Sequence, residues 1–182
     1  LLDDIKKAGL RIQATWARPV MVRRFNAMLK EGNKASLEFS VIMDMVERLL
    51  TDSKGEEIRL ICDKLGGRDR YAPILAARFP MEEVRIHAES RRESRYEIPG
   101  RKLHVTFKMG ADGSHALVAG ASIMAKYSRE VLMRSFNSFW VGKIPGLEPT
   151  AGYPEDARRF IEAVKPALET MGFSASWLVR EK

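Results

Sequence analysis

The sequence contains a single cysteine, Cys62, so no internal disulfide can form. This agrees with a reducing compartment, and we expect Cys62 to be a small, buried strand residue. No apolar run is long enough to cross a bilayer, and residues 1–7 carry acidic side chains early, without a signal-peptide pattern. The histidines lie far apart, and none stands at zinc-ligand spacing from Cys62. These absences argue against a disulfide-stabilised secreted module, a membrane-spanning protein and a zinc protein, and they predict a cytoplasmic location.

The composition is that of a globular chain with an excess of positive charge. Its 182 residues are enough for one domain, and 45% of them are hydrophobic. Lys and Arg number 31 against 24 Asp and Glu, which gives a net charge of +7 and a pI near 9.7. This balance favours a polyanionic partner such as nucleic acid, although many basic proteins bind none. The first residue is Leu and not Met, so we expect a processed or truncated chain with a segment missing upstream.

Periodicity and turn residues predict a mixed α/β fold without internal repeats. Helices are expected at 1–9, 20–30, 35–50, 71–79, 115–139 and 154–171, the last of them kinked at Pro166. Strands are expected at 10–20, 58–62, 84–87, 96–98 and 103–107. The side chains of 116–125 are unusually small, which would let the long helix approach another backbone closely.

Asp63 ends an apolar strand and opens a loop over 63–71. Ligands and catalytic groups of α/β proteins gather at the carboxyl ends of strands, so Asp63 is a candidate metal ligand; a turn cap is the alternative. The glycines at 66–67 permit a tight turn or the close approach of a phosphate, but the loop is not a Walker A loop, because no Gly-Lys-Ser/Thr follows. Three basic residues would surround that phosphate with positive charge: Lys64, Arg68 and Arg70.

Asp112 lies between the last strand and the long helix. Taken alone it predicts an Asx turn or a helix cap. Taken with Asp63, it is a second carboxylate at a strand-to-helix junction, and two such carboxylates can share a divalent metal ion. Lys126 and Arg129 lie three residues apart on one helix face, where they would either clamp phosphates or form an ordinary solvated face.

The segment 118–130 resembles the signature of type 2 ribonuclease H, in which an alanine-rich stretch leads into Ser-Ile-x-Ala-Lys and then Arg-Asp. That family has an Asp ten residues before the Ser, as Asp112 is ten residues before Ser122. A second family Asp, at the end of an apolar strand, matches Asp63, and a Gly-Tyr pair before the last helix matches 152–153. The similarity runs from about Phe25 onward. It is strongest to a bacterial branch of the family whose motifs match 63–68, 136–140 and 149–154.

The resemblance implies a fold and an activity. The fold is α/β, with a ribonuclease H-like mixed sheet flanked by helices, in one domain over 1–182. The activity is endonucleolytic cleavage of the RNA strand of RNA–DNA hybrids, or at ribonucleotides in DNA, with two Mg²⁺ or Mn²⁺ ions. Asp63 and Asp112 would be catalytic metal ligands, and Tyr153 would stack on the sugar at an RNA–DNA junction and sense its 2′-hydroxyl. The predicted substrate-binding residues are Lys64, Arg68, Arg70, Ser122, Lys126, Arg129 and Tyr153.

Two features depart from the family pattern. The Asp-Glu-x-Gly motif of the first strand, which supplies two more metal ligands, has no counterpart, since Asp3–Asp4 is followed by Ile5–Lys6. The first strands of the fold are also missing. We therefore expect this motif upstream of Leu1, and we expect the 182 residues alone to be nearly inactive. The Arg-rich hairpin at about 83–108 is longer than usual, and it is either a solvated hairpin or an added nucleic-acid surface.

Other hypotheses remain open. The chain could be a non-catalytic nucleic-acid-binding relative, a nuclease of the same fold with another substrate such as branched DNA, or a basic domain with an unrelated partner.

Overall fold

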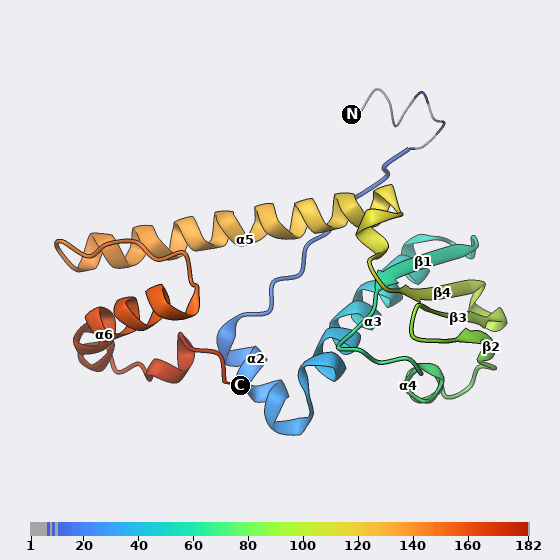
Figure 1. Cartoon of the computed structure of the whole chain (residues 1–182), viewed down its shortest axis with the longest axis horizontal. Helices are drawn as coiled ribbons and strands as arrows, with labels where there is room; N and C mark the ends of the chain where they lie inside the picture. Colours follow the sequence, from blue (N-terminus) through green and yellow to red (C-terminus); the bar gives the residue numbers. More distant parts are fainter. Residues whose placement is uncertain (1–6, 8, 10, 182) are drawn as a thin grey trace.

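A mixed sheet of four strands occupies one end of the molecule in the computed structural model, which describes residues 7, 9 and 11–181 (Figure 1). The order across the sheet is β1-β4-β3-β2. β1 runs parallel to β4, and the other neighbours are antiparallel. The strands are β1 (Ile58–Asp63), β2 (Arg85–Glu89), β3 (Glu93–Ile98) and β4 (Leu103–Lys108).

One face of this sheet is buried and the other is polar. In β4, Leu103, Val105 and Phe107 are fully buried and alternate with more exposed polar residues. The buried face packs against α3 (Lys34–Asp52) and α4 (Ala72–Arg78). At its centre the ring of Phe107 stacks on Tyr71, with 3.7 Å between centroids. Cys62 is a strand residue that packs against the same core, as predicted, but it is only partly buried.

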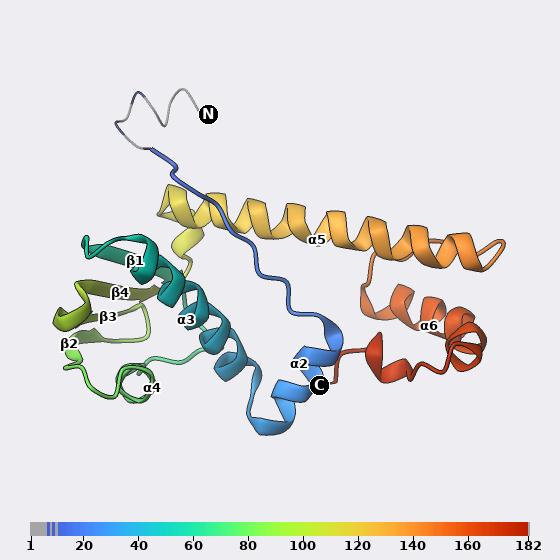
Figure 2. The same ribbon diagram turned by 180° about the vertical axis from the view of Figure 1, so that it is seen from behind.

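The long helix α5 (Ala116–Lys143) leads from the sheet to a second hydrophobic core, as Figures 1 and 2 both show. That core joins the end of α5 to α6 (Pro154–Thr170) through Trp140 and Phe160. Helix α6 continues through Pro166 as one helix. The first half of α5 has no such cover among the described residues, and its Leu117 is 66% exposed. α5 also contacts β1, and the close approach to another backbone that its small residues would permit stays a prediction.

The carboxyl-terminal segment is fastened to α2 (Val22–Glu31) by one buried side chain, Asn26. Its amide nitrogen donates to the carbonyls of Ser176 (3.0 Å) and Val179 (2.8 Å), and its oxygen accepts from the amide of Glu181 (2.9 Å). The carboxyl-terminal segment thus lies beside α2, as Figure 1 shows. No described helix has the length and apolar character needed to cross a membrane.

The expected strand at 10–20 is wrong over its described part. Residues 11–20 have no strand assignment and run as a coil that contacts α3. Trp16 lies under the guanidinium of Arg48 at 4.5 Å, and Arg18 pairs with Asp44 at 3.0 Å. Alternating apolar and polar residues form a strand only where a neighbour offers backbone hydrogen bonds, and here a helix is the neighbour. The helix expected at 1–9 falls outside the described residues except at 7 and 9. The other expected helices and strands are present with shifted ends, and the mixed α/β sheet flanked by helices is confirmed as a fold consistent with ribonuclease H.

Candidate active site

Asp63 and the segment that carries Asp112 lie at the same edge of the sheet. Because β1 and β4 are parallel, their carboxyl ends lie side by side, with Asp63 opposite Lys108. The chain leaves β4 through a short turn into a 3-10 helix, η2 (Ala111–Gly113), which carries Asp112 and contacts β1. The structure therefore brings the two predicted metal ligands to the same edge.

Asp63 both caps the turn before η2 and keeps an oxygen available. Its Oδ1 accepts hydrogen bonds from the backbone amides of Lys64 (2.9 Å) and Gly110 (3.0 Å). Gly110 has φ +62°, a left-handed conformation that favours glycine, so the turn depends on this residue. Among the described residues nothing hydrogen-bonds to Oδ2 of Asp63. The cap and metal-ligand interpretations of Asp63 are thus compatible, because each uses a different oxygen.

The donor set suits a hard divalent cation but is small. Both carboxylates are exposed, and carboxylate oxygens are the ligands that Mg²⁺ and Mn²⁺ prefer. The described residues contain no group of three or more His, Cys, Asp or Glu side chains arranged to hold a metal. Asp63 and Asp112 therefore fit as part of a metal site, with room for further ligands.

Two residues beside the carboxylates were missed by sequence reasoning. Lys108 ends β4 opposite Asp63, and its Nζ lies 3.5 Å from Nε2 of His115, which precedes α5. Lys108 could have been predicted from the sequence, because it ends the strand that pairs with the strand ending at Asp63. His115 carries none, since its contact with Lys108 depends on the turn between them.

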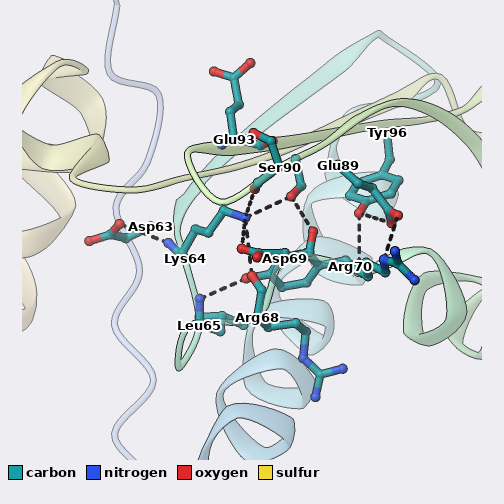
Figure 3. A network of polar contacts seen from close by, with 12 residues as sticks. Asp63, Lys64, Leu65, Arg68, Asp69, Arg70, Glu89, Ser90, Glu93 and Tyr96 are labelled. Atoms are coloured by element: carbon teal, nitrogen blue, oxygen red, sulfur yellow. Dashed lines mark hydrogen bonds and ion pairs between the residues drawn. The ribbon is translucent and has the colours of Figure 1, made fainter.

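Lys64 is buried and turned away from Asp63 (Figure 3). Its side chain is only 7% exposed, and its ammonium pairs with Asp69 at 3.0 Å. It also donates to Ser94 Oγ at 3.0 Å and to the carbonyls of Arg68 and Ser90. The ammonium thus joins the loop after β1 to the hairpin between β2 and β3, and it is fully engaged within the protein.

Two tyrosines also hold the loop after β1 through hydrogen bonds. Tyr71 accepts a hydrogen bond from the amide of Leu65 at 3.0 Å, and the amide of Tyr71 donates to the hydroxyl of Tyr96 at 2.8 Å. The Tyr96 hydroxyl donates in turn to Glu89 at 2.6 Å. Burial raises the pKa of both tyrosines, and for Tyr96 the hydrogen bond to Glu89 raises the pKa further. Both phenols therefore stay protonated. Their hydrogen bonds, which sequence reasoning did not foresee, hold the loop after Asp63 together with the ion pair of Lys64 and Asp69.

The two arginines of this loop point outward. The side chain of Arg70 is 85% exposed, and its Nε lies 4.0 Å from Glu89. Arg68 is half-buried, and its guanidinium extends away from the network in Figure 3. In that view Asp63 and Arg70 lie at opposite ends of the network, so the loop does not bring Arg70 to the carboxylates.

Arg129 and Tyr153 form a second, separate cluster. The Arg129 guanidinium lies 5.7 Å from the centroid of the Tyr153 ring and donates to the carbonyl of Ala151. Gly152 has φ +76°, and a Cβ there would sit 3.3 Å from Nη2 of Arg129. The glycine therefore lets Arg129 lie against the loop, while the Tyr153 ring stays 67% exposed.

Asp156 holds the loop that carries Tyr153. Its Oδ2 accepts from the Thr150 hydroxyl at 2.6 Å and from the amide of Ala151 at 2.7 Å, and its Oδ1 pairs with Arg159 at 2.8 Å. The hydrogen bond from Thr150, followed by those from Arg159 and Ala151, lowers the pKa of Asp156 to about 2. The aspartate is therefore ionised throughout the physiological range and keeps the loop in one conformation.

The two clusters are connected by one face of α5. Ser122, Lys126 and Arg129 follow each other at i, i+4 and i+7, so they share that face. A helical rise of 1.5 Å per residue places Arg129 about 20 Å along the axis from Ala116. The structure thus brings Asp63 and Asp112 together and Arg129 and Tyr153 together, but it keeps the two pairs apart.

This architecture defines a class of protein. A mixed sheet of four strands flanked by helices is consistent with a ribonuclease H-like fold. The family model of Ribonuclease HII matches residues 73–167, more than half of the chain. The chain belongs to the ribonuclease HII family. It is therefore of a nuclease class that acts on nucleic acid and generally depends on divalent metal ions. No curated protein and no solved structure matches the chain.

Proposed function

We propose that this protein takes part in metal-dependent endonucleolytic cleavage of the RNA strand of RNA–DNA hybrids, or of DNA at embedded ribonucleotides. The observation that carries the proposal is that β1, which ends at Asp63, contacts η2, which carries Asp112 and leads into α5. Its place of action is proposed to be the cytoplasm.

Asp63 and Asp112 would hold Mg²⁺ or Mn²⁺ ions. Two such ions, when bound about 4 Å apart, activate the attacking water and stabilise the leaving oxygen of the phosphodiester. Asp63 would contribute its Oδ2, since Oδ1 is occupied by the amides of Lys64 and Gly110. The same two hydrogen bonds orient the carboxylate and fix the turn that positions Asp112 relative to it.

Basic and aromatic residues would hold the nucleic acid beyond the carboxylates. Lys126 is exposed on the shared face of α5, and Ser122 lies one turn closer to the carboxylates. Arg129 supports the Tyr153 ring, whose exposure leaves it accessible for stacking on a sugar or base. Arg68 and Arg70 would add positive charge from the loop after β1. Lys64 would act through that loop, because its ammonium is committed to the protein.

The family site uses two further carboxylates, and we propose that an Asp-Glu-x-Gly segment upstream of Leu1 supplies them. With two carboxylates alone, residues 1–182 are expected to hold two metal ions poorly and to cleave slowly.

The test is cleavage of three matched duplexes with Mg²⁺ or Mn²⁺: an RNA–DNA hybrid, a DNA duplex with one ribonucleotide, and plain DNA. In the protein that includes the upstream segment, Asp63→Asn and Asp112→Asn should each reduce cleavage of the first two duplexes by at least about a hundredfold, because each removes a metal ligand. Circular dichroism should show both variants folded. Full activity in both variants would refute the metal assignment, and preferred cleavage of plain or branched DNA would refute the substrate.

A second candidate is a non-catalytic nucleic-acid-binding relative. It is favoured by the small donor set, because the described residues offer no group of three or more metal-ligating side chains. The gene sequence upstream of Leu1 separates the two candidates. An Asp-Glu-x-Gly strand there supports the enzyme, and its absence from the whole gene leaves a binding protein.

A further inference from the structure

The turn that joins β2 to β3 presents two adjacent arginines at its tip. Ser90 and Glu93 close this turn, with the amide of Ser90 donating to the carbonyl of Glu93 at 3.0 Å and the Ser90 hydroxyl accepting from the amide of Glu93 at 3.1 Å. Arg91 and Arg92 are the two residues between them, and both are exposed. The tip is therefore a tight turn whose two free positions are both cationic.

This tip lies at the same edge of the sheet as the carboxylates. Across that edge Asp63 is opposite Lys108, and Lys108 is opposite Glu93. The carbonyl of Arg92 accepts from the amide of Met109 at 2.9 Å, which fixes the tip to the turn that leads toward Asp112. Two strand spacings place the tip about 10 Å from Asp63.

The buried ammonium of Lys64 holds the tip in this place. It donates to the carbonyl of Ser90 and to the hydroxyl of Ser94, on either side of the arginines (Figure 3). Because Lys64 directly follows Asp63, one residue connects the carboxylate strand to the hairpin tip. The tip arginines therefore lie on a turn that hydrogen bonds from Lys64 hold in place.

The pairing of the hairpin arginines differs between its tip and the rest. Arg85, Arg95 and Arg101 each pair with a glutamate, at 3.0, 3.0 and 2.7 Å. Within the described part of the chain, neither Arg91 nor Arg92 has an ion pair or a side-chain hydrogen bond. Glu93, the nearest carboxylate in sequence, is engaged by Arg95. Among the arginines of the hairpin, those without a carboxylate partner in the described part of the chain are therefore the two at its tip.

We propose that Arg91 and Arg92 form a phosphate-binding site for a nucleic-acid duplex whose cleaved bond lies at Asp63 and Asp112. A separation of about 10 Å corresponds to about three nucleotide steps along one strand. Arginine binds phosphate through paired N–H donors, which suits contacts that position a duplex without reading its bases. This site rests on the proposed function for the nature of its ligand, and it adds a contact outside the signature helix.

The test compares two double variants that remove the same charge from the same hairpin. Arg91→Gln/Arg92→Gln removes the tip pair, and Arg85→Gln/Arg101→Gln removes two paired arginines at the far end. The probe is a fluorescent RNA–DNA hybrid, titrated at 50 to 200 mM salt in EDTA so that metal binding and cleavage play no part. Thermal unfolding of each variant checks that it is folded.

The tip variant should bind about tenfold or more weakly at about 0.1 M salt, and its plot of log affinity against log salt should lose about 1.8 from its slope, since each lost contact removes about 0.9. The far-end variant should keep the wild-type slope. Arg91→Lys/Arg92→Lys, which keeps both charges, should restore most of the wild-type slope. Equal slopes for the two Gln variants, or no binding by any protein, would overturn the site. Binding as expected, with no cleavage after metal is added to the protein that includes the proposed upstream segment, would instead overturn the proposed function and leave the site intact.

Discussion

Asp156 illustrates how a single ionised side chain holds a loop in place. Its pKa is lowered from an ordinary 3.8 to about 2, chiefly by the hydrogen bond from Thr150. Because ionisation is favoured in the folded state, the stabilisation is fully present above the ordinary pKa and is lost as the pH falls through about 2.

We expect Asp156→Asn to lower the thermal midpoint of unfolding at pH 5 to 7. The difference from wild type should shrink below pH 4 and disappear only below pH 2, because both proteins then carry a neutral side chain. Differential scanning calorimetry across this range measures it. A difference that does not change with pH would show that the charge of Asp156 is not what holds the Thr150–Tyr153 loop.

At the scale of elements, the loop after β1 depends on one buried cation. Lys64→Met removes hydrogen bonds to Asp69, Ser94 and two carbonyls while keeping the length of the side chain. We expect it to lower the free energy of unfolding by about 1–3 kcal/mol, since acceptors lose their partner. Urea denaturation measures this loss.

The matched control for Lys64 is Lys126→Met, which removes the same charge from an exposed position on α5. It should leave the free energy of unfolding within about 0.5 kcal/mol of wild type. Equal effects of the two substitutions would mean that Lys64 is not a structural residue.

The elements that sequence could predict are those set by local pattern. The core face of α3 follows a helical repeat and β4 alternates strictly, so both were predictable from their own residues. Segment 11–20 also alternates between apolar and polar residues, but it is a coil because it lies against the helix α3 and not against a strand. The residues of the segment do not specify that neighbour.

The same distinction applies to the candidate site. That Asp63 and the segment carrying Asp112 lie at the same edge of the sheet was predictable, because Asp63 ends β1, Asp112 follows β4, and β1 and β4 are parallel. Their role as metal ligands stays a prediction. The inward direction of Lys64 was not predictable, since it depends on Ser90, which is 26 residues away. The separation of Tyr153 from the carboxylates was likewise unpredictable, because it follows from the unbroken length of α5.

At the scale of the whole molecule, the contact between α2 and the carboxyl-terminal segment depends on Asn26. Replacing it by Ala leaves the carbonyls of Ser176 and Val179 without their donor. We expect Asn26→Ala to lower the free energy of unfolding by about 1–3 kcal/mol and to speed proteolysis within 174–181.

Limited proteolysis followed by mass spectrometry locates the cleavage, with Lys30→Ala, an exposed change on the same helix, as the control. Unchanged stability together with unchanged proteolysis would show that the segment is held by its ring contacts alone, such as that of Arg23 with Trp177.

Because α5 is unbroken, its length fixes the distance between its start and Arg129. The start of the helix adjoins Asp112, and Arg129 lies about 20 Å further on, a span equal to about six nucleotides at 3.4 Å each. A duplex that ends sooner than this beyond the cut would reach the carboxylates without reaching Tyr153. If the proposed function holds, we expect the apparent KM of the protein that includes the proposed upstream segment to rise stepwise when hybrids are shortened past about six base pairs on that side. Arg129→Gln should remove the step. A smooth dependence on duplex length would show that the helix does not measure its substrate.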